Sequence, residues 1–462
     1  MTIIENEKEL DILQNKLTRN ESFFLFVPEN PFDNSPFNKT SALFVYLCQN
    51  EETYCLIGTH SDFDNHINIE SFITNIETNK FIYVYNKRLL LSEISCKLNN
   101  LKSNFIDVNF ASYVTENRKL VLNDEMYLTN TYRKFLSEFG QKMNNEIIPI
   151  NSHYEYYKLV LESFIFIYDT HKYVLMKNKK LLIHLDEYYT NNYYEFEQHG
   201  ISVDSKLLKR LNKTVFIKKG KIYSNYKFFT KTGRPTNTFC KLNLLALDKS
   251  SNIRKSFVSR FNDDGLLYQF DYNSFHLKLI SVLLNINIDE KNLHVYLGKK
   301  MFPDDPTIEY NEIKIKIFKQ LYGGISHEYM NIDFFKKLND FINQLWETLN
   351  GSGVVFTKLF KRPMYKNKLS NDINKITFFN YYIQSFESEF CSNIIYDINQ
   401  YIKQHNLKST LILYTYDSFL FDMHKDEYEY LLQLKKIIEF NNFFDTTMKF
   451  GSNYNELNLV KL

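Results

Sequence analysis

Short apolar runs alternate with polar, asparagine-rich stretches along the first third of this 462-residue chain. Three of these runs are FFLFV (23–27), ALFVYLC (42–48) and FIYVY (81–85), and their length and composition are typical of strands. From about residue 150 to 205 the pattern becomes helical, and its most apolar part is LVLESFIFIYDTHKYVLM (159–176). The pattern therefore predicts a mixed α/β region that is followed by helices.

The C-terminal half predicts a longer series of elements. An apolar strand ends at Asp271, helical segments cover roughly 274–350, and the basic stretch 353–365 reads as a hairpin. A long helix is expected from about 378 to 405, because large apolar residues recur there at a spacing of four. Two apolar runs in 411–423 meet at an aspartate, which predicts a β-hairpin with that aspartate at its turn.

Composition narrows the class of protein. Hydrophobic content of 44% and charged content of 24% are ordinary for a globular chain, and the formal net charge of +2 creates no global field for nucleic acid. The five cysteines include no CxxC pair, which favours a reduced, intracellular protein without a zinc site. Because there is no bilayer-length apolar run and no signal-peptide pattern, we expect a cytoplasmic protein without a membrane partner, in the host cytosol if it is viral.

One local stretch departs from the balanced charge. From Ser205 to Arg234 the chain carries ten Lys or Arg residues and no Asp or Glu, with Tyr and Phe interleaved. Such a run is most often a solvated face. Alternatively, basic side chains between aromatic rings could follow a phosphate backbone.

Two aspartates far apart in sequence, Asp271 and Asp417, each lie at the end of an apolar strand. If the two strands are neighbours in one sheet, the carboxylates converge and can bind Mg²⁺ together with a substrate phosphate. That arrangement is what two-metal phosphoryl transfer requires. The alternative is that each aspartate merely ends a strand.

A predicted helix over 310–323 adds three side chains. Lys314, Phe318 and Tyr322 recur every four residues and share one face of that helix. A lysine, a ring and a tyrosine on one face could hold a triphosphate, stack on a base and touch a template. The alternative is an ordinary amphipathic helix whose lysine extends its amine to water.

Further motifs occur in the order that is known from one family. They are EFEQHGISVD (195–204), GKIYSNYKFFTKTGRPTN (220–237), KLNLLAL and NIRKSF (241–257), DYNSFHLK (271–278), FNYYIQ (379–384), YDS (416–418) and GSNY (451–454). With the helix over 310–323, this ordered set resembles the family A DNA polymerases, typified by bacterial DNA polymerase I and its phage relatives.

The resemblance implies an α+β right-hand fold, with palm and fingers, a reduced thumb, and a preceding α/β domain like the RNase H-like 3′–5′ exonuclease. The thumb is expected to be reduced because only residues 205–233 separate the GISVD and TGR motifs. The implied divisions are 1–176 (degenerate exonuclease-like domain), 177–234 (linker and reduced basic thumb remnant), 235–290 (first part of the palm), 291–375 (fingers) and 376–462 (second part of the palm).

The implied activity is template-dependent addition of dNTPs to a primer 3′-OH by two-metal-ion phosphoryl transfer, in a phage or similar replicon. Asp271 and Asp417 would bind two Mg²⁺ ions, for which Mn²⁺ could substitute, and the Tyr272 carbonyl would be a third ligand. Lys314 would neutralise the phosphates.

The resemblance also implies nucleotide and DNA contacts. Phe318 would stack on the incoming nucleotide, Tyr322 would lie beside the template base, and Tyr272 and His276 would belong to the same nucleotide site. The residues implied to bind primer–template DNA are Arg234, Lys231, Asn243, Arg254, Asn380, Gln384 and Tyr416.

Several positions depart from the family pattern. The fingers arginine is replaced by Tyr310, and a glycine after the ring by Lys319. The glutamate that excludes the ribose 2′-OH is His276, and the glutamate after the second aspartate is Ser418. These last two changes leave a single-subunit RNA polymerase or primase-like enzyme as an alternative. A non-catalytic nucleic-acid-binding scaffold is a second alternative, and a reduced thumb suggests a protein partner that supplies processivity.

The first domain resembles the exonuclease only in outline. Val27 stands where the family has an aspartate, whereas Glu29 is retained. Asp107 starts a helix like that of the second motif, and Asp169 is the counterpart of the third motif, whose tyrosine is Ile165. Because hydrolysis by two metals needs clustered carboxylates, we expect no proofreading activity.

Overall fold

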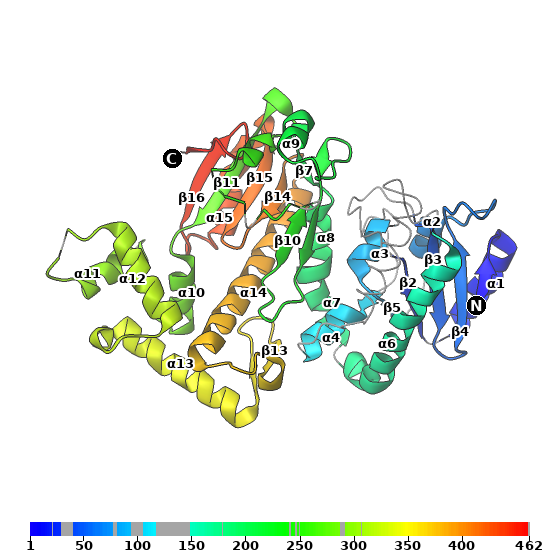
Figure 1. Cartoon of the computed structure of the whole chain (residues 1–462), viewed down its shortest axis with the longest axis horizontal. Coiled ribbons are helices and arrows are strands. Elements are labelled where there is room, and N and C mark those ends of the chain that lie inside the picture. Colours follow the sequence, from blue (N-terminus) through cyan, green and yellow to red (C-terminus); the bar gives the residue numbers. More distant parts are fainter. Residues whose placement is uncertain are drawn as a thin grey trace. The chain divides into compact units, whose positions relative to one another are not determined.

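The computed structural model describes the chain apart from a set of short gaps and one longer one. Those gaps are residues 21, 29–39, 77–80, 94–104, 117–147, 178, 240–241, 245–246, 249, 287–291, 306 and 461–462. The chain divides into two compact units, Met1–Tyr194 and Glu195–Leu462 (Figure 1). None of the helices in the described residues is both long enough and apolar enough to cross a bilayer.

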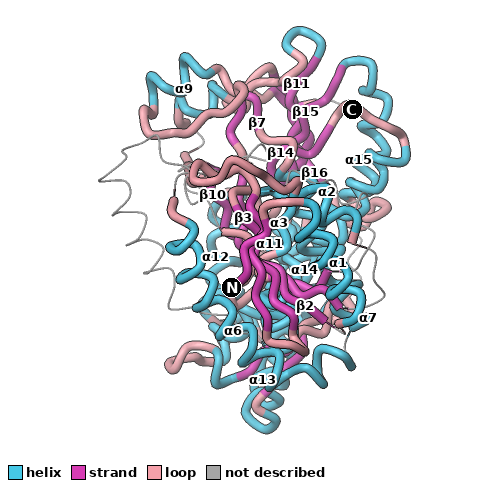
Figure 2. Tube along the Cα trace, turned by 90° about the vertical axis from the view of Figure 1, so that its right-hand side faces the viewer, coloured by secondary structure: helices cyan, strands magenta, loops and turns pink. Residues whose placement is uncertain are grey.

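The first unit is built on a six-stranded mixed sheet, in the order β1-β4-β3-β2-β5-β6. Its strands are β1 (Thr2–Ile4), β2 (Ser22–Phe26), β3 (Ala42–Leu47), β4 (Glu52–Ile57), β5 (Phe81–Val84) and β6 (Phe105–Asp107). Strands β2, β5 and β6 are parallel to one another, whereas β3 runs antiparallel to β2 and β4; β2 and β3 lie side by side in Figure 2. The three predicted strands of this region are confirmed.

The first unit also contains a series of helices, the last of which continues into the second unit. They are α1 (Glu7–Arg19), α2 (Ile69–Asn75), α3 (Lys87–Glu93), α4 (Val108–Glu116), α6 (Ile150–Lys177), α7 (Lys179–Asp186), the π-helix η3 (Glu187–Asn191) and α8 (Asn192–Glu197). Alternate side chains of β2 point to opposite faces. Phe23 belongs to a core cluster with residues of α1 and α2, whereas the ring of Phe24 stacks on Phe164 of α6, with 4.2 Å between centroids. The sheet therefore has apolar packing on both faces.

The strand-end aspartate of this unit is used by the fold. Asp107 ends β6, is buried, and accepts hydrogen bonds from the backbone N–H of Lys87 (2.7 Å) and of Phe110 (3.0 Å). It thereby caps the start of α4. Burial raises its pKa to about 6. The nearby Asp186 accepts from Lys87 Nζ at 2.6 Å.

The other exonuclease-like positions do not form a carboxylate cluster with it in the described part of the chain. Val27 is buried in the apolar core, and Asp169 is exposed on α6, one turn from the half-buried Ile165. Glu29 lies outside the described residues. The absence of proofreading stays a prediction.

The second unit is built on a five-stranded antiparallel sheet, in the order β14-β15-β11-β16-β17. Its strands are β11 (Gly265–Tyr272), β14 (Thr410–Tyr414), β15 (Ser418–His424), β16 (Thr446–Gly451) and β17 (Asn458–Leu459). The predicted hairpin of 411–423 is confirmed as β14 and β15. The strand predicted to end at Asp271 continues one residue further, to Tyr272.

Three helices lie beside this sheet: α14 (Lys375–Gln404), with α10 (Phe275–Leu283) and α15 (Leu431–Ile438) each packed against it (Figure 1). The predicted long helix is confirmed as α14, which begins three residues earlier because Asn374 caps it by accepting from the backbone N–H of Ile376 and Thr377. Aromatic rings join the layers, as with Phe390 of α14 and Phe444, whose centroids lie 4.8 Å apart.

A helical lobe precedes α14. It contains α11 (Leu293–Met301), α12 (Tyr310–Gly323) and α13 (Asp333–Ser352), followed by a hairpin of β12 (Val354–Phe356) and β13 (Pro363–Tyr365). The predicted hairpin of 353–365 is confirmed. Helices α12 and α13 both contact α14, so the lobe is anchored on the long helix.

The segment implied to be a reduced thumb contains little regular structure. It holds α9 (Ser205–Leu211), β8 (Lys221–Ile222) and β9 (Ser224–Lys227). Strand β9 pairs with β10 (Thr236–Phe239), and β8 pairs with β7 (Ile201–Ser202). The Tyr226 hydroxyl binds both the backbone N–H and the carbonyl of Tyr414 at 2.9 Å, which ties this segment to the edge of the five-stranded sheet. The palm, fingers and thumb boundaries stay predictions.

Candidate active site

The two predicted aspartates are neighbours. Strand β11 pairs with β15 so that Asp271 lies opposite Ser418, and the backbone N–H of Tyr272 donates to the Asp417 carbonyl at 2.9 Å. Asp417 belongs to the tight turn between β14 and β15, where Tyr416 has a φ of 62°. The expectation that the two strands adjoin is therefore confirmed, and both carboxylates belong to one end of the sheet.

The electrostatics of this pair favour a cation. The Asp417 side chain opens onto a cavity, but protein atoms crowd its other sides and raise the pKa of its carboxyl to about 6. The negative charges of Asp271 and Glu387 contribute further to that shift. Two carboxylates that repel each other are best neutralised by a bound cation, and Mg²⁺ prefers such oxygen ligands.

The pair cannot complete a metal shell by itself. Among the described residues, no group of three or more His, Cys, Asp or Glu side chains is placed to hold a metal ion. Mg²⁺ is commonly bound by only one or two carboxylates, with water and substrate phosphates completing six ligands. Asp271 and Asp417 fit that pattern, and the role of the Tyr272 carbonyl as a further ligand stays a prediction.

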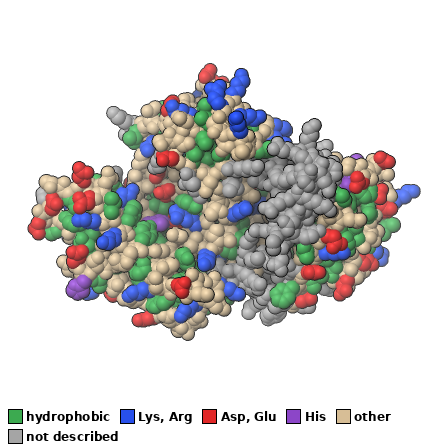
Figure 3. Space-filling view, viewed as in Figure 1, with side chains coloured by type: hydrophobic (Ala, Val, Ile, Leu, Met, Phe, Trp, Pro, Cys, Tyr) green, Lys and Arg blue, Asp and Glu red, His purple; other side chains and the backbone are tan. Residues whose placement is uncertain are grey.

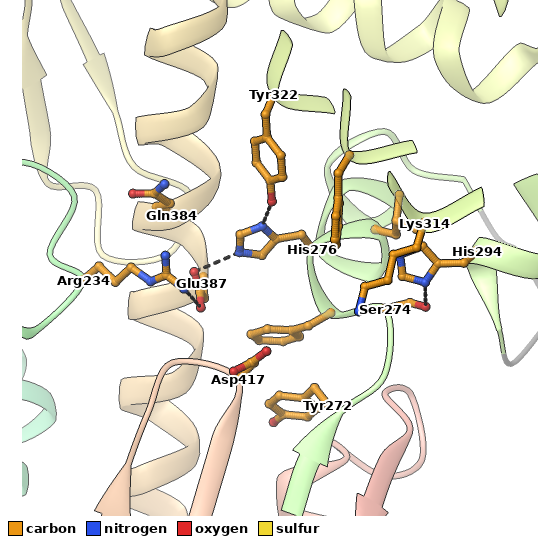
Figure 4. A pocket seen from close by; sticks show the side chains of 13 residues that line it. Arg234, Tyr272, Ser274, His276, His294, Lys314, Tyr322, Gln384, Glu387 and Asp417 are labelled. Atoms are coloured by element: carbon orange, nitrogen blue, oxygen red, sulfur yellow. Dashed lines mark hydrogen bonds and ion pairs between the residues drawn. The ribbon is translucent and has the colours of Figure 1, made fainter. Parts of the chain in front are cut away.

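A cavity of about 470 Å³ opens beside Asp417 (Figure 4). Asp271 is not among the residues that line it and adjoins Asp417 through the pairing of β11 with β15. Many of the predicted site residues line it: Arg234, Tyr272, His276, Lys314, Phe318, Tyr322, Gln384 and Asp417. Ser274, Phe275, Leu277, His294 and Glu387 complete the lining. Side chains from the sheet, α10, α12 and α14 thus converge on one space.

Helix α12 presents its predicted face to this cavity. Lys314, Phe318 and Tyr322 line it, whereas Ile317 and Leu321 are buried against the rest of the lobe. Lys314 Nζ lies 5.6 Å from the centroid of the Phe318 ring. The helical spacing read from the sequence therefore predicted correctly that the three side chains share one face.

A histidine stands beside Lys314. The His294 Nδ1 is 2.6 Å from the Ser274 hydroxyl and 3.5 Å from that of Tyr310, the residue in place of the fingers arginine. Burial, together with the charge of Lys314, lowers the pKa of His294 to about 4. The imidazole is therefore neutral at neutral pH, and Lys314 is the cation on this side of the cavity.

The opposite wall is a connected polar network. The His276 ring binds the Tyr322 hydroxyl through Nδ1 and Glu387 Oε2 through Nε2, the latter at 2.9 Å (Figure 4). Arg234 Nη2 donates to Glu387 Oε1 at 3.3 Å. The Arg234 guanidinium also lies 3.7 Å from the centroid of the Tyr416 ring, within cation–π range.

Glu387 is the functional candidate that sequence reasoning missed. Its side chain is only 1% exposed, although it is a carboxylate. The signal was present in the sequence, because Asn380, Gln384 and Glu387 are spaced i, i+4 and i+7 and so share a face of α14. The family motif that FNYYIQ resembles ends at Gln384 and does not include position 387.

Other predicted DNA-binding residues lie outside the cavity lining. Arg254 is buried, and its guanidinium lies 3.9 Å from the centroid of the Tyr454 ring, so it packs the C-terminal segment. Lys231 and Asn243 are exposed, and Asn380 is partly buried on α14. Figure 3 shows Lys and Arg side chains in the central part of the second unit. The DNA contacts of these residues stay predictions.

Comparison with known proteins supports the fold. No family model matches the sequence. The structure is similar to a solved structure described as the POL domain of Pol1 from M. smegmatis in complex with DNA primer-template and dNTP. The TM-score is 0.70 at 14% sequence identity, and the match covers 98% of this chain and 99% of that chain. The chain therefore has a family A-like polymerase fold, whereas its reduced thumb and degenerate exonuclease-like domain stay predictions.

Proposed function

We propose that this protein is a template-dependent DNA polymerase that adds dNTPs to a primer 3′-OH, in a phage or similar replicon. The observation that carries the proposal is that Asp417 and Lys314 line one cavity, while the pairing of β11 with β15 brings Asp271 beside Asp417. The similar polymerase domain from M. smegmatis was solved with primer–template DNA and dNTP, which agrees with this assignment.

Each lining element has a task in this reaction. Lys314 binds the triphosphate and offsets its negative charge. His294 beside it is neutral, so it neither repels nor neutralises the positive charge of Lys314. The exposed face of the Phe318 ring offers a platform on which a base can stack, with Tyr322 one turn further along. Catalysis of phosphoryl transfer depends mainly on such positioning and charge stabilisation.

The two aspartates would hold the metal. Asp271 and Asp417 fit Mg²⁺, or Mn²⁺ in its place, because burial and then the charge of Asp271 raise the pKa of Asp417, and a bound cation would offset both effects. When bound, two such ions would supply activation of the attacking oxygen and neutralisation of the leaving pyrophosphate. The chain's own contribution is to align the two carboxylates through the pairing of β11 with β15.

The competing functions rest on particular residues. An RNA polymerase or primase-like enzyme is suggested by His276 and Ser418. Ser418 is buried, and its hydroxyl accepts from Gln269 Nε2 at 2.7 Å, so it supports the sheet and adds no third carboxylate. A non-catalytic scaffold would have no use for a pair of adjacent aspartates, Asp271 and Asp417, beside a cavity that Lys314 also lines. DNA synthesis is therefore the function that we favour.

Two finer features belong to the same proposal. We propose that the chain has no proofreading exonuclease, because Asp107 is consumed as a helix cap and Val27 is apolar. We also propose that a protein partner compensates for the reduced thumb and confers processivity. Long synthesis by the isolated chain in the presence of a DNA trap would contradict the need for that partner.

The first experiment is extension of a labelled primer on a DNA template with Mg²⁺, with dNTPs and rNTPs supplied separately. We expect extension with dNTPs, loss of that extension in Asp417→Asn, and normal extension in Asp263→Asn, which replaces an exposed surface aspartate. Efficient rNTP use would move the protein to RNA synthesis. DNA binding without extension by either substrate would support the scaffold.

A further inference from the structure

Glu387 is a buried carboxylate to which the proposed reaction assigns no direct task. Removing a carboxylate from water is strongly unfavourable unless partners compensate for the lost hydration. Its two oxygens have different partners: Oε1 accepts from Arg234 at 3.3 Å, and Oε2 is 2.9 Å from His276 Nε2. Arg234 offsets the negative charge of Glu387. In the described part of the chain, His276 is the only other side chain that is close enough to form an ion pair with Glu387.

The same contacts hold the His276 ring from both sides. Burial and the charge of Glu387 raise the pKa of Tyr322 well above its ordinary value, so the phenol keeps its proton and can donate to His276 Nδ1. Nε2 then carries the ring proton and donates to the Glu387 carboxylate. With both nitrogens engaged, the ring has one orientation and no nitrogen left to bind a ligand hydroxyl.

The His276 ring lies where the sugar of a bound nucleotide would pass. His276 lies in the first turn of α10, between Tyr322 of α12 and Glu387 of α14 (Figure 4). If the base stacks at Phe318 and the phosphates lie toward Lys314 and Asp417, the sugar that joins them must cross the wall formed by His276. An added 2′-OH at that wall would be desolvated and would find no partner.

Resting on the polymerase function proposed above, we propose that Glu387 is a positioning residue that holds the His276 imidazole and thereby sets the preference for deoxyribose over ribose. Removing Glu387 frees Nε2 and releases one of the two tethers of the ring. The ring can then move aside or bind the 2′-OH, and either change admits a ribonucleotide.

The test is the ratio of kcat/KM for an rNTP to kcat/KM for the matching dNTP, measured on one primer–template. We expect Glu387→Ala to raise this ratio at least about tenfold, and His276→Ala to raise it by as much or more. Because Glu387 acts through His276, adding Glu387→Ala to His276→Ala should leave the ratio of the single His276 variant unchanged.

A matched control lies two residues away. Glu389 is also a buried glutamate of α14, but its carboxylate accepts from the backbone N–H of Leu359 and Phe360, both at 3.0 Å. Glu389→Gln should therefore lower the unfolding temperature without changing the ratio of kcat/KM for the rNTP to that for the dNTP. If Glu387→Ala does not fold, Glu387→Gln keeps the volume and removes the charge, and a smaller rise in the ratio is expected.

The outcomes separate this inference from the proposed function. A wild-type chain that extends with neither nucleotide overturns the polymerase assignment. A wild-type chain that extends with dNTPs, together with a ratio that neither Glu387 variant changes, overturns only the positioning role. A further rise of the ratio when Glu387→Ala is added to His276→Ala would show that Glu387 acts independently of the ring, which also overturns it.

Discussion

Asp107 in the first unit and Asp271 in the second are both strand-end aspartates followed by a helix, yet the fold uses them differently. Helix α4 begins directly after Asp107, whose carboxylate accepts two backbone N–H groups and caps it. Helix α10 begins four residues after Asp271, and the intervening Ser274 has a left-handed φ of 53°. Asp271 is therefore too far from the helix start to cap it in the same way, and it stays beside Asp417.

The difference shows what a carboxylate needs in order to serve chemistry. At Asp107 the hydrogen bonds of the fold consume the acceptor capacity, whereas at Asp417 the carboxylate opens onto a cavity lined by Lys314 and aromatic rings. Both groups have a pKa raised to about 6, so the pKa shift alone does not distinguish them. The distinction comes from access and from the partners on the other side of the cavity.

The largest effect is expected from exchanging aspartate for asparagine at Asp271. Loss of a carboxylate that we propose binds metal should lower nucleotide addition by roughly a thousandfold or more, because such charge stabilisation supplies several kcal/mol. Its thermal unfolding should change little. Single-turnover incorporation and a melting curve measure the two effects, and undiminished incorporation would remove Asp271 from the site.

Substitution of Asp107 tests whether this aspartate serves the fold and not the reaction. Asp107→Asn should cost about 1–3 kcal/mol of stability, because asparagine keeps one acceptor oxygen and leaves one of the two backbone N–H groups, that of Lys87 or that of Phe110, without its partner. Incorporation by the folded chain should stay unchanged. Chemical denaturation measures the first quantity, and primer extension below the unfolding temperature measures the second. A folded Asp107→Asn protein without polymerase activity would show that the comparison is wrong.

A smaller loss of activity is expected from a substitution on helix α12. Lys314→Ala removes the cation that we propose binds the phosphates and should reduce kcat/KM for dNTPs by roughly a hundredfold. Lys319→Ala on the same helix is the control, because Lys319 is exposed and not part of the cavity lining. Equal losses in the two variants would mean that the helix contributes charge in general and not a specific phosphate contact.

The raised pKa of Asp107 also predicts how the stability of the folded chain depends on pH. Its pKa in the folded chain, about 6, exceeds the ordinary value of 3.8, so the folded state binds the proton more tightly than the unfolded state. The stability from this group is therefore present below about pH 4 and is lost as the pH rises to about 6. Denaturation curves of the wild type and of Asp107→Asn across that range should differ in slope, and parallel curves would contradict the shift.

The smallest expected effect concerns the basic segment. Lys231→Ala should weaken DNA binding less than about tenfold and reduce the slope of log affinity against log salt by about one, since one phosphate contact is lost. A fluorescence titration at several salt concentrations measures both quantities. An unchanged slope would assign Lys231 to the solvated face that charged runs usually form.

Much of the local structure was predictable from the sequence. The strands β2, β3 and β5, the hairpins of 353–365 and 411–423, and the long helix α14 followed from apolar periodicity. Helical spacing also placed Lys314, Phe318 and Tyr322 on one face, because neighbours along a helix are determined by its geometry. The family A-like fold was expected from ordered motifs, and the similar solved structure supports it.

The tertiary structure alone decided which polar groups are used up by the fold and which face the cavity. Asp107 and Asp271 have similar sequence settings, but only the positions of α4 and α10 show that the first is a cap. Arg254, which the sequence predicts to contact DNA, packs on the Tyr454 ring, and its DNA contact stays a prediction. Glu387 and His276 lie 111 positions apart and meet only because α10 and α14 pack together, and no pattern along a single segment contains that information.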